Sequence, residues 1–416
     1  MEVARNIYLE ELKRKEGNGM IKIITGVLRC GKSYLLRTIF KNYLLDYEVP
    51  VSHIIEMAFD SRENVSFRNP DVFYAWAKEK IKDKERYYFL LDEVQMMDDF
   101  ESVLNGLNDF PNTDIYVTGS NAKFLSKDIA TEFAGRGDDV HMYPLSFAEF
   151  MTVYTGDAMH GLQEYMLYGG IPLVVLADRQ DKPALLKTLF DETYLRDIIR
   201  RNKIRNQREL EDLLNVLSSQ IGSLTNPEKL KNTFRTIKKS KITANTIGKY
   251  LGFLEDAFLV EASSRYDVKG RAYIETPKKY YFTDMGLRNV RINFRQIEPT
   301  HIMENIIYNE LRIRNYAVDV GVVPVAEKNE KGSVIRKQLE IDFVCNKGGK
   351  KYYIQSAYSL PDEEKRQQEI RPFLKTNDSF KKIIITNEVT PALYDENGIL
   401  MLNFINFLTD PNCMEM

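Results

Sequence analysis

Eight residues near the start of the chain have the types and the spacing needed to bind phosphate groups. Gly26 to Ser33, GVLRCGKS, fit the pattern G-x-x-x-x-G-K-[ST]. The two glycines allow a tight turn in which successive backbone N–H groups point into one concavity at a helix N-terminus, whose dipole favours anions. Lys32 can then reach the β- and γ-phosphates, and the Ser33 hydroxyl can ligate Mg²⁺. The predicted ATP-binding residues are Gly26, Val27, Leu28, Arg29, Cys30, Gly31, Lys32, Ser33 and Tyr34.

Two adjacent carboxylates follow a short apolar run about sixty residues further on. Tyr87 to Leu91 lead directly into Asp92 and Glu93. At the end of a buried strand, Asp92 can hold Mg²⁺ while Glu93 orients and polarises an attacking water. The alternative is a strand that ends in two solvated acids, but the phosphate loop upstream favours the metal-binding interpretation.

Polar groups also end the next strand, and a glycine-flanked arginine follows. Ser120 and Asn121 come after the apolar run from residue 114 to 118, where either could contact the γ-phosphate or the water, or cap a helix. Arg136 stands between Gly135 and Gly137. It is our candidate for an arginine that stabilises transition-state charge, in its own subunit or in a neighbouring one; a surface arginine is the alternative.

Alternating strands and helices must position these groups. The apolar runs predict strands before Gly26 and over 51–59, 86–91, 114–118 and 140–146, and the periodicity predicts helices over 71–82 and 99–108. This alternation favours an α/β fold with a parallel sheet, in which the carboxyl ends of the strands line one ligand crevice.

The motifs resemble those of AAA-type P-loop ATPases of archaea and bacteria. The phosphate loop, LLDEVQ, VTGSNA, AGRG and YPLSFAEF occur in the same order and spacing. More narrowly, the chain resembles the ATPases that carry a C-terminal domain of the DUF4143 kind. The phosphate loop of that family often has two adjacent arginines, whereas this chain has Leu28-Arg29. The resemblance implies an ATPase core over 1–157 and a small helical lid over 158–222, in which Arg196 could contact nucleotide or simply lie on a solvated face.

A winged helix is predicted over 223–299. Helices over 227–238 and 241–256, the second capped by Thr243, precede strand-like runs over 258–266 and 279–283. Residues 228–295 carry 15 lysines and arginines against 7 aspartates and glutamates, a balance of +8 in a chain whose net charge is −2. A basic island in an acidic chain favours contact with DNA phosphates, although a spacer or protein-contact module would have a similar pattern. The predicted contact residues are Thr243, Asn245, Thr246, Lys249, Lys269 and Arg271.

The remaining segment, 300–416, is predicted to be a third α/β region. Its order of elements resembles the restriction-endonuclease-like PD-(D/E)XK fold, and by that resemblance Glu304 and Asp342 match metal-binding acids while Gln355 matches the variable acid. Ala357 stands where the family has a lysine that stabilises the pentavalent phosphate. We therefore expect an inactive nuclease-like domain that serves as a binding scaffold.

Composition places the chain among ordinary globular proteins. Of its 416 residues 44% are hydrophobic and 28% are charged, and no apolar run approaches the length of a membrane span. The first 18 residues are charged and lack the apolar core of a secretion signal, so we expect a cytoplasmic protein without a membrane partner. The leading hypothesis is an ATPase that acts on DNA, as a monomer or a homo-oligomer. The alternatives are a slow nucleotide-gated switch and an ATP-driven, metal-dependent nuclease.

Overall fold

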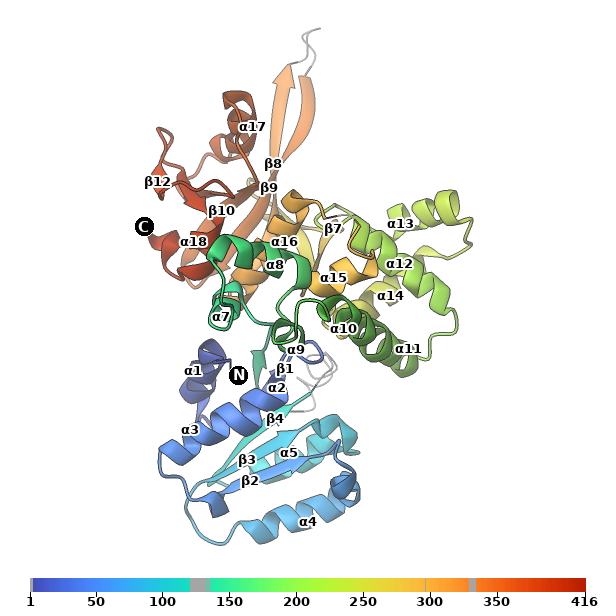
Figure 1. Ribbon diagram of the computed structural model, residues 1–416, viewed down its shortest axis with the longest axis vertical. Helices are drawn as coiled ribbons and strands as arrows, with labels where there is room; N and C mark the ends of the chain where they lie inside the picture. The colour runs from blue at the N-terminus through green and yellow to red at the C-terminus, as the bar shows by residue number, and fades with distance from the viewer. Residues whose placement is uncertain (1–2, 120–132, 134, 296, 329–333) are drawn as a thin grey trace. The chain divides into compact units, whose positions relative to one another are not determined.

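The computed structural model describes residues 3–119, 133, 135–295, 297–328 and 334–416. The chain forms two compact units (Figure 1). The first is Met1–Pro144 with Asp256–Phe258, and the second is Leu145–Glu255 with Leu259–Met416. In the described part of the chain, no helix combines the length and the apolar character needed to cross a membrane.

The first unit is built on a five-stranded parallel sheet in the order β2-β3-β4-β1-β5. Its strands are β1 (Ile21–Thr25), β2 (Ile54–Ala58), β3 (Tyr87–Asp92), β4 (Thr113–Thr118) and β5 (Gly137–His141). Strands β1 and β3 are buried along their whole length, because parallel strands in the middle of a sheet are covered on both faces. This is the P-loop NTPase sheet that the sequence predicts.

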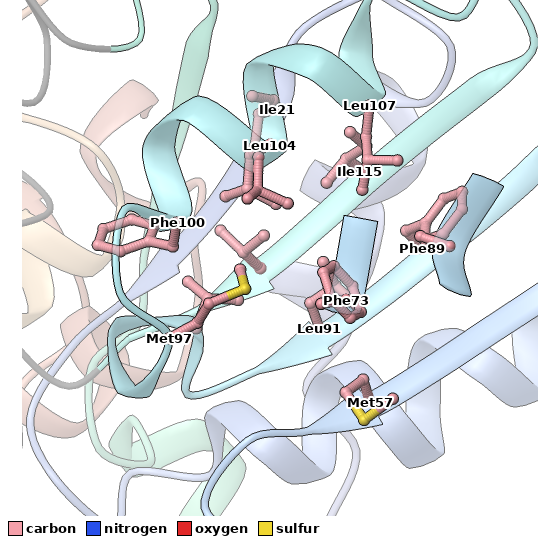
Figure 2. Packing of buried hydrophobic residues seen from close by; sticks show 14 of the residues in the cluster. Ile21, Met57, Phe73, Phe89, Leu91, Met97, Phe100, Leu104, Leu107 and Ile115 are labelled. Atoms are coloured by element: carbon pink, nitrogen blue, oxygen red, sulfur yellow. The ribbon is translucent and has the colours of Figure 1, made fainter. Parts of the chain in front are cut away.

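Helices cover the sheet on both faces. They are α1 (Asn6–Lys15), α2 (Lys32–Tyr34), the π-helical turn η1 (Leu35–Phe40), α3 (Lys41–Asp46), α4 (Pro70–Lys80) and α5 (Phe100–Asn108). Apolar side chains from α4 and α5 meet those of the strands in one core. Figure 2 shows part of it, with Phe73, Phe89, Leu91, Leu104 and Ile115 packed together. Burying such side chains stabilises the fold by roughly 1.5–3 kcal/mol each.

The second unit contains a mixed eight-stranded sheet in the order β12-β13-β11-β10-β9-β8-β6-β7. Its strands are β6 (Val260–Asp267), β7 (Ala272–Phe282), β8 (Ala317–Lys328), β9 (Val334–Lys347), β10 (Lys350–Ala357), β11 (Lys381–Thr386), β12 (Leu393–Tyr394) and β13 (Leu400–Asn403). The main helices are α7 (Phe147–Met151), α8 (Ala158–Tyr168), α9 (Pro172–Val175), α10 (Lys182–Thr188), α11 (Arg196–Arg201), α12 (Gln207–Ser219), α13 (Pro227–Thr233), α14 (Ala244–Asp256), α15 (Met285–Arg291), α16 (Pro299–Ile313), α17 (Glu363–Leu374) and α18 (Phe404–Thr409).

The strands expected as the wing of a separate domain belong to this large sheet. Strand β6 pairs with β7 in antiparallel fashion and with β8 in parallel, with Arg265 opposite Val320. The segments predicted as lid, winged helix and C-terminal domain therefore share one compact unit, and the expected boundary at residue 299 falls within it. A hairpin pattern in the sequence does not show which third strand will pair with it.

A buried carboxylate joins α8 to α15 inside the second unit. Asp284 accepts hydrogen bonds from the N–H groups of Gly170 (2.7 Å) and Leu287 (3.0 Å). A Cβ atom on Gly169, where φ is +74°, would overlap the carboxylate, so glycine is needed there. Burial raises the pKa of Asp284 to about 6.

This pKa predicts how the stability of the second unit depends on pH. Because the folded protein binds the Asp284 proton more tightly than the unfolded chain, this group favours folding at low pH. The contribution is lost as the pH rises through about 6. Relative to Asp284→Asn, which does not titrate, the wild type should lose about 2–3 kcal/mol of unfolding free energy between pH 4 and pH 7. Urea unfolding of both proteins across this range measures the difference, and parallel pH profiles would contradict the assignment.

Candidate active site

The phosphate loop connects β1 to α2 in the conformation that the sequence predicts. Gly26 has φ +139° and Gly31 has φ +106°, and a Cβ atom on Gly26 would overlap the carbonyl oxygen of Met142. The buried Lys32 ammonium donates to the carbonyl oxygens of Gly26 (2.9 Å) and Val27 (3.1 Å). The Lys32 ammonium therefore lies beside the backbone amides of the loop. Phosphate oxygens of a bound nucleotide would replace the two carbonyl oxygens as its hydrogen-bond partners.

Three side chains from three elements meet next to this loop. The Ser33 hydroxyl, on α2, donates to the Asp92 carboxylate at the end of β3, at 3.0 Å. The Thr118 hydroxyl, at the end of β4, donates to the same Asp92 oxygen and accepts from the Glu93 N–H at 3.0 Å. Asp92 and Thr118 are both buried, so their polar atoms form hydrogen bonds within the protein rather than with water.

Glu93 has a strained backbone in this arrangement. Its φ of +53° and ψ of +48° lie in the left-handed region, which costs a residue other than glycine roughly 1–3 kcal/mol. The hydrogen bond from its N–H to Thr118 helps hold it there, and the side-chain amide of Gln95 donates to its carboxylate. Strain of this kind is typical of functional positions.

The oxygens in this site suit Mg²⁺. A hydroxyl and a carboxylate are hard oxygen ligands, and Mg²⁺ in nucleotide sites takes one or two of them together with phosphates and waters. Ser33 and Asp92 provide that pair at hydrogen-bond distance from each other. Within the described ranges, no group of three or more His, Cys, Asp or Glu side chains is arranged to hold a metal on its own. The site thus fits a metal that arrives with a nucleotide.

Comparison with known proteins agrees with this geometry. Residues 18–151 match the family described as "AAA domain", and residues 159–298 match "Domain of unknown function (DUF8612)". An "Uncharacterized protein" of Haemophilus influenzae is 34% identical over 392 residues, covering 93% of this chain and 94% of that protein. This chain belongs to the same family. Most of its first unit is similar to the AAA domain family. The second match is to DUF8612 and not to the DUF4143 domain that the sequence motifs suggested.

More distant similarities extend over most of the chain. A Methanocaldococcus jannaschii protein, also uncharacterised, is 28% identical over 391 residues and covers 88% of this chain and 82% of its own length. The Aeropyrum pernix ORC1 protein, solved in complex with DNA, has 10% identity and a TM-score of 0.30, covering 70% of this chain and 92% of its own. Cdc6p of Pyrobaculum aerophilum has 10% identity and a TM-score of 0.31, covering 73% and 97%. These scores are too low to carry an argument about function.

Three predicted contributors to the site lie elsewhere or outside the described residues. Ser120 and Asn121 fall in the range 120–132, which is not among the residues described. Arg136 pairs with Asp109 at 2.9 Å, and its carbonyl accepts from Ile21 N–H at the start of β1. The phosphate loop leaves the other end of β1, roughly 13–16 Å away for a strand of this length. Arg136 thus lies far from the phosphate loop of its own subunit, and its role toward nucleotide, in its own or in a neighbouring subunit, stays a prediction.

The AAA domain also contains a supporting arginine that sequence reasoning missed. Arg5 is buried and donates to the carbonyl oxygens of Cys30 (3.3 Å) and Tyr143 (2.6 Å). Its guanidinium lies 4.8 Å from the centre of the Tyr8 ring. Arg5 thus supports the phosphate loop from the side of the N-terminal segment. An arginine ahead of a charged amphipathic helix gives no sequence signal for such a contact.

The predicted DNA-contact residues lie on two elements. Thr243 caps α14, as predicted, by accepting from the Thr246 N–H at 3.2 Å. Asn245 and Lys249 are on the same helix, and both are exposed. In the β6–β7 turn, Lys269 donates to the carbonyl of Pro324 at 2.9 Å, and Arg271 is exposed. Arg196 forms an exposed ion pair with Glu192 at 3.0 Å, typical of a solvated helix face.

Removing the Thr118 hydroxyl tests whether it positions the site. Thr118→Val keeps the shape of the side chain but leaves the Glu93 N–H and the Asp92 carboxylate without their shared partner. Hydrogen bonds to charged groups contribute about 1.5–3 kcal/mol, so ATP turnover should fall about 10- to 100-fold while affinity for ATP changes little. Thr113→Val, the same change at the start of β4, is the control and should leave turnover near that of the wild type. Equal turnover in the Thr118 variant and the wild type would show that the hydroxyl does not position the pair.

Proposed function

We propose that the protein is a Mg²⁺-dependent ATPase that hydrolyses ATP to ADP and phosphate, and that its nucleotide state repositions a basic module that contacts DNA. The observation that carries the proposal is the hydrogen-bonded group beside the phosphate loop, in which Asp92 accepts from the hydroxyls of Ser33 and Thr118 and Thr118 accepts from the Glu93 N–H. Such an arrangement positions catalytic groups, and catalysis of phosphoryl transfer consists mostly of positioning and charge stabilisation.

Each residue has a role in the proposed reaction. The loop amides and Lys32 bind the phosphates, since amides at a helix N-terminus and an ammonium both favour anions. Bound Mg²⁺, held by Ser33 and Asp92, would neutralise the charge that develops on the phosphate oxygens. Glu93 orients a water molecule toward the γ-phosphate and accepts its proton. An arginine such as Arg136 could complete the site of a neighbouring subunit, which would make turnover depend on assembly.

Charge supports DNA as the partner. The +8 balance of residues 228–295 contrasts with −10 for the rest of the chain. Arg271 in the β6–β7 turn is exposed, as a phosphate contact must be. Binding of this kind depends on phosphate neutralisation, so affinity for duplex DNA should fall steeply as the salt concentration rises.

A slow nucleotide-gated switch is the second candidate, and the contacts of two catalytic side chains favour it. Lys32 is bound to carbonyls of its own loop, and the Glu93 carboxylate is bound by Gln95, so both catalytic groups are engaged within the protein. A partner that releases them would turn on hydrolysis. Tight retention of ATP with negligible turnover, with or without DNA, would favour the switch over the ATPase.

Replacing Glu93 tests the proposed chemistry. Glu93→Gln keeps the size of the side chain but removes the base, so turnover should fall roughly 100-fold or more while ATP still binds. Steady-state phosphate release is measured across protein concentration, with and without duplex DNA. A rise with concentration indicates assembly, and a rise with DNA indicates that partner. The control is Glu85→Gln, an exposed acid just ahead of β3. Undiminished hydrolysis by Glu93→Gln would refute the assignment.

A further inference from the structure

A buried lysine lies at the centre of the acids that were expected to form a nuclease-like site. The Lys279 ammonium, from β7, lies 2.9 Å from the Glu304 carboxylate on α16. It also lies 2.8 Å from Glu340 and 3.7 Å from Asp342, both on β9. The side chain of Lys279 is only 4% exposed, so these carboxylates rather than water surround its charge. The cluster of Lys279, Glu304, Glu340 and Asp342 is called the lysine–carboxylate cluster below.

The remaining contacts of the cluster also come from within the protein. The Tyr281 hydroxyl donates to Glu304 at 2.7 Å, and the Ser356 N–H donates to Asp342 at 2.8 Å. Gln355, expected as the third ligand, accepts from the Asp342 N–H at 3.3 Å and donates to Glu369 at 2.9 Å. The side-chain amide of Gln355, on β10, thus links this strand to β9 and to α17.

A divalent metal, which the nuclease-like resemblance implies, does not fit this arrangement. A metal ligated by Glu304 and Asp342 needs the space between their carboxylates, and the Lys279 ammonium takes that position with a positive charge that would repel the ion. Nor do the described residues place these acids in a group that could hold a metal.

We propose that Lys279 is the resident cation of the lysine–carboxylate cluster, where it replaces a divalent ion, closes the site to metals and fastens β7 to α16 and β9. The reason is electrostatic. Buried carboxylates that face one another require a positive charge between them, and a covalently attached ammonium supplies it at every metal concentration. The cluster is then a structural clamp, and the nuclease hypothesis loses its metal centre.

The proposal makes an unusual prediction: removing the lysine should create a metal site. Lys279→Met leaves Glu304, Glu340 and Asp342 without their cation, so Mn²⁺ should bind with a dissociation constant of about 10⁻⁴ M, the range of weak all-oxygen sites. The wild type should bind Mn²⁺ at least about tenfold more weakly. Mn²⁺ binding is measured by electron paramagnetic resonance without nucleotide, in full-length chains that also carry Asp92→Asn to exclude the phosphate-loop carboxylate.

Thermal unfolding gives a second readout. Without metal, Lys279→Met should unfold at a lower temperature than the wild type, because uncompensated buried charges are strongly destabilising. Adding Mn²⁺ should raise the unfolding temperature of this variant but not that of the wild type. Lys278→Met, the neighbouring lysine on β7, is the matched control and should gain no Mn²⁺ affinity. The double variant Lys279→Met with Glu304→Gln removes one charge of each sign, so it should regain stability and bind Mn²⁺ more weakly than the single variant.

Two results would overturn the proposal. One is Mn²⁺ binding by the Lys279-containing protein that is lost on Glu304→Gln, since this would mean that the metal and the lysine coexist. The other is a folded Lys279→Met chain that binds Mn²⁺ no better than the Lys278→Met control. If Lys279→Met does not fold, the first comparison still decides, because it uses chains that keep the lysine.

Discussion

The shared attachment of Asp92 and Glu93 to one hydroxyl is the constraint on which the AAA site depends. Thr118 ends β4 and binds both Asp92, the last residue of β3, and Glu93, which follows it. The pairing of β3 with β4 therefore holds the proposed metal ligand and the proposed base in place. Ser33 adds the phosphate loop to the same carboxylate. Because parallel strands end at one edge of the sheet, three segments far apart in sequence present their oxygens at a single place.

Support from behind the phosphate loop completes this arrangement. Arg5 joins the loop carbonyl of Cys30 to Tyr143, and the Cys30 thiol donates to the Met142 carbonyl at 3.4 Å. The close approach of Gly26 to Met142 adds a steric limit. These contacts hold the loop in one conformation before the ligand binds. Binding of an anion by the loop amides then costs less conformational entropy, which favours affinity.

Each unit also buries a lysine among acids. In the AAA domain, Lys22 pairs with Asp114, which also accepts from the Tyr116 hydroxyl at 3.0 Å. In the second unit, Lys279 serves three carboxylates. Buried pairs of this kind add little net stability over apolar residues of the same shape, but losing one partner is costly. They therefore fix which strand lies beside which neighbour more than they raise the overall stability.

What the sequence by itself determined is local. The spacing of Gly26, Gly31 and Lys32 and the apolar run before Asp92 were sufficient to predict the loop and its flanking strands, because each depends on neighbours a few residues away. The role of Asp92 as a metal ligand stays a prediction. Only the tertiary structure decided that Thr118 joins the two acids, that Arg136 lies at the far end of β1, and that Lys279 enters the cluster of Glu304 and Asp342. These are contacts between residues 25 to more than 60 positions apart. They depend on strand order and on which side chain reaches across a sheet, which no short sequence pattern specifies.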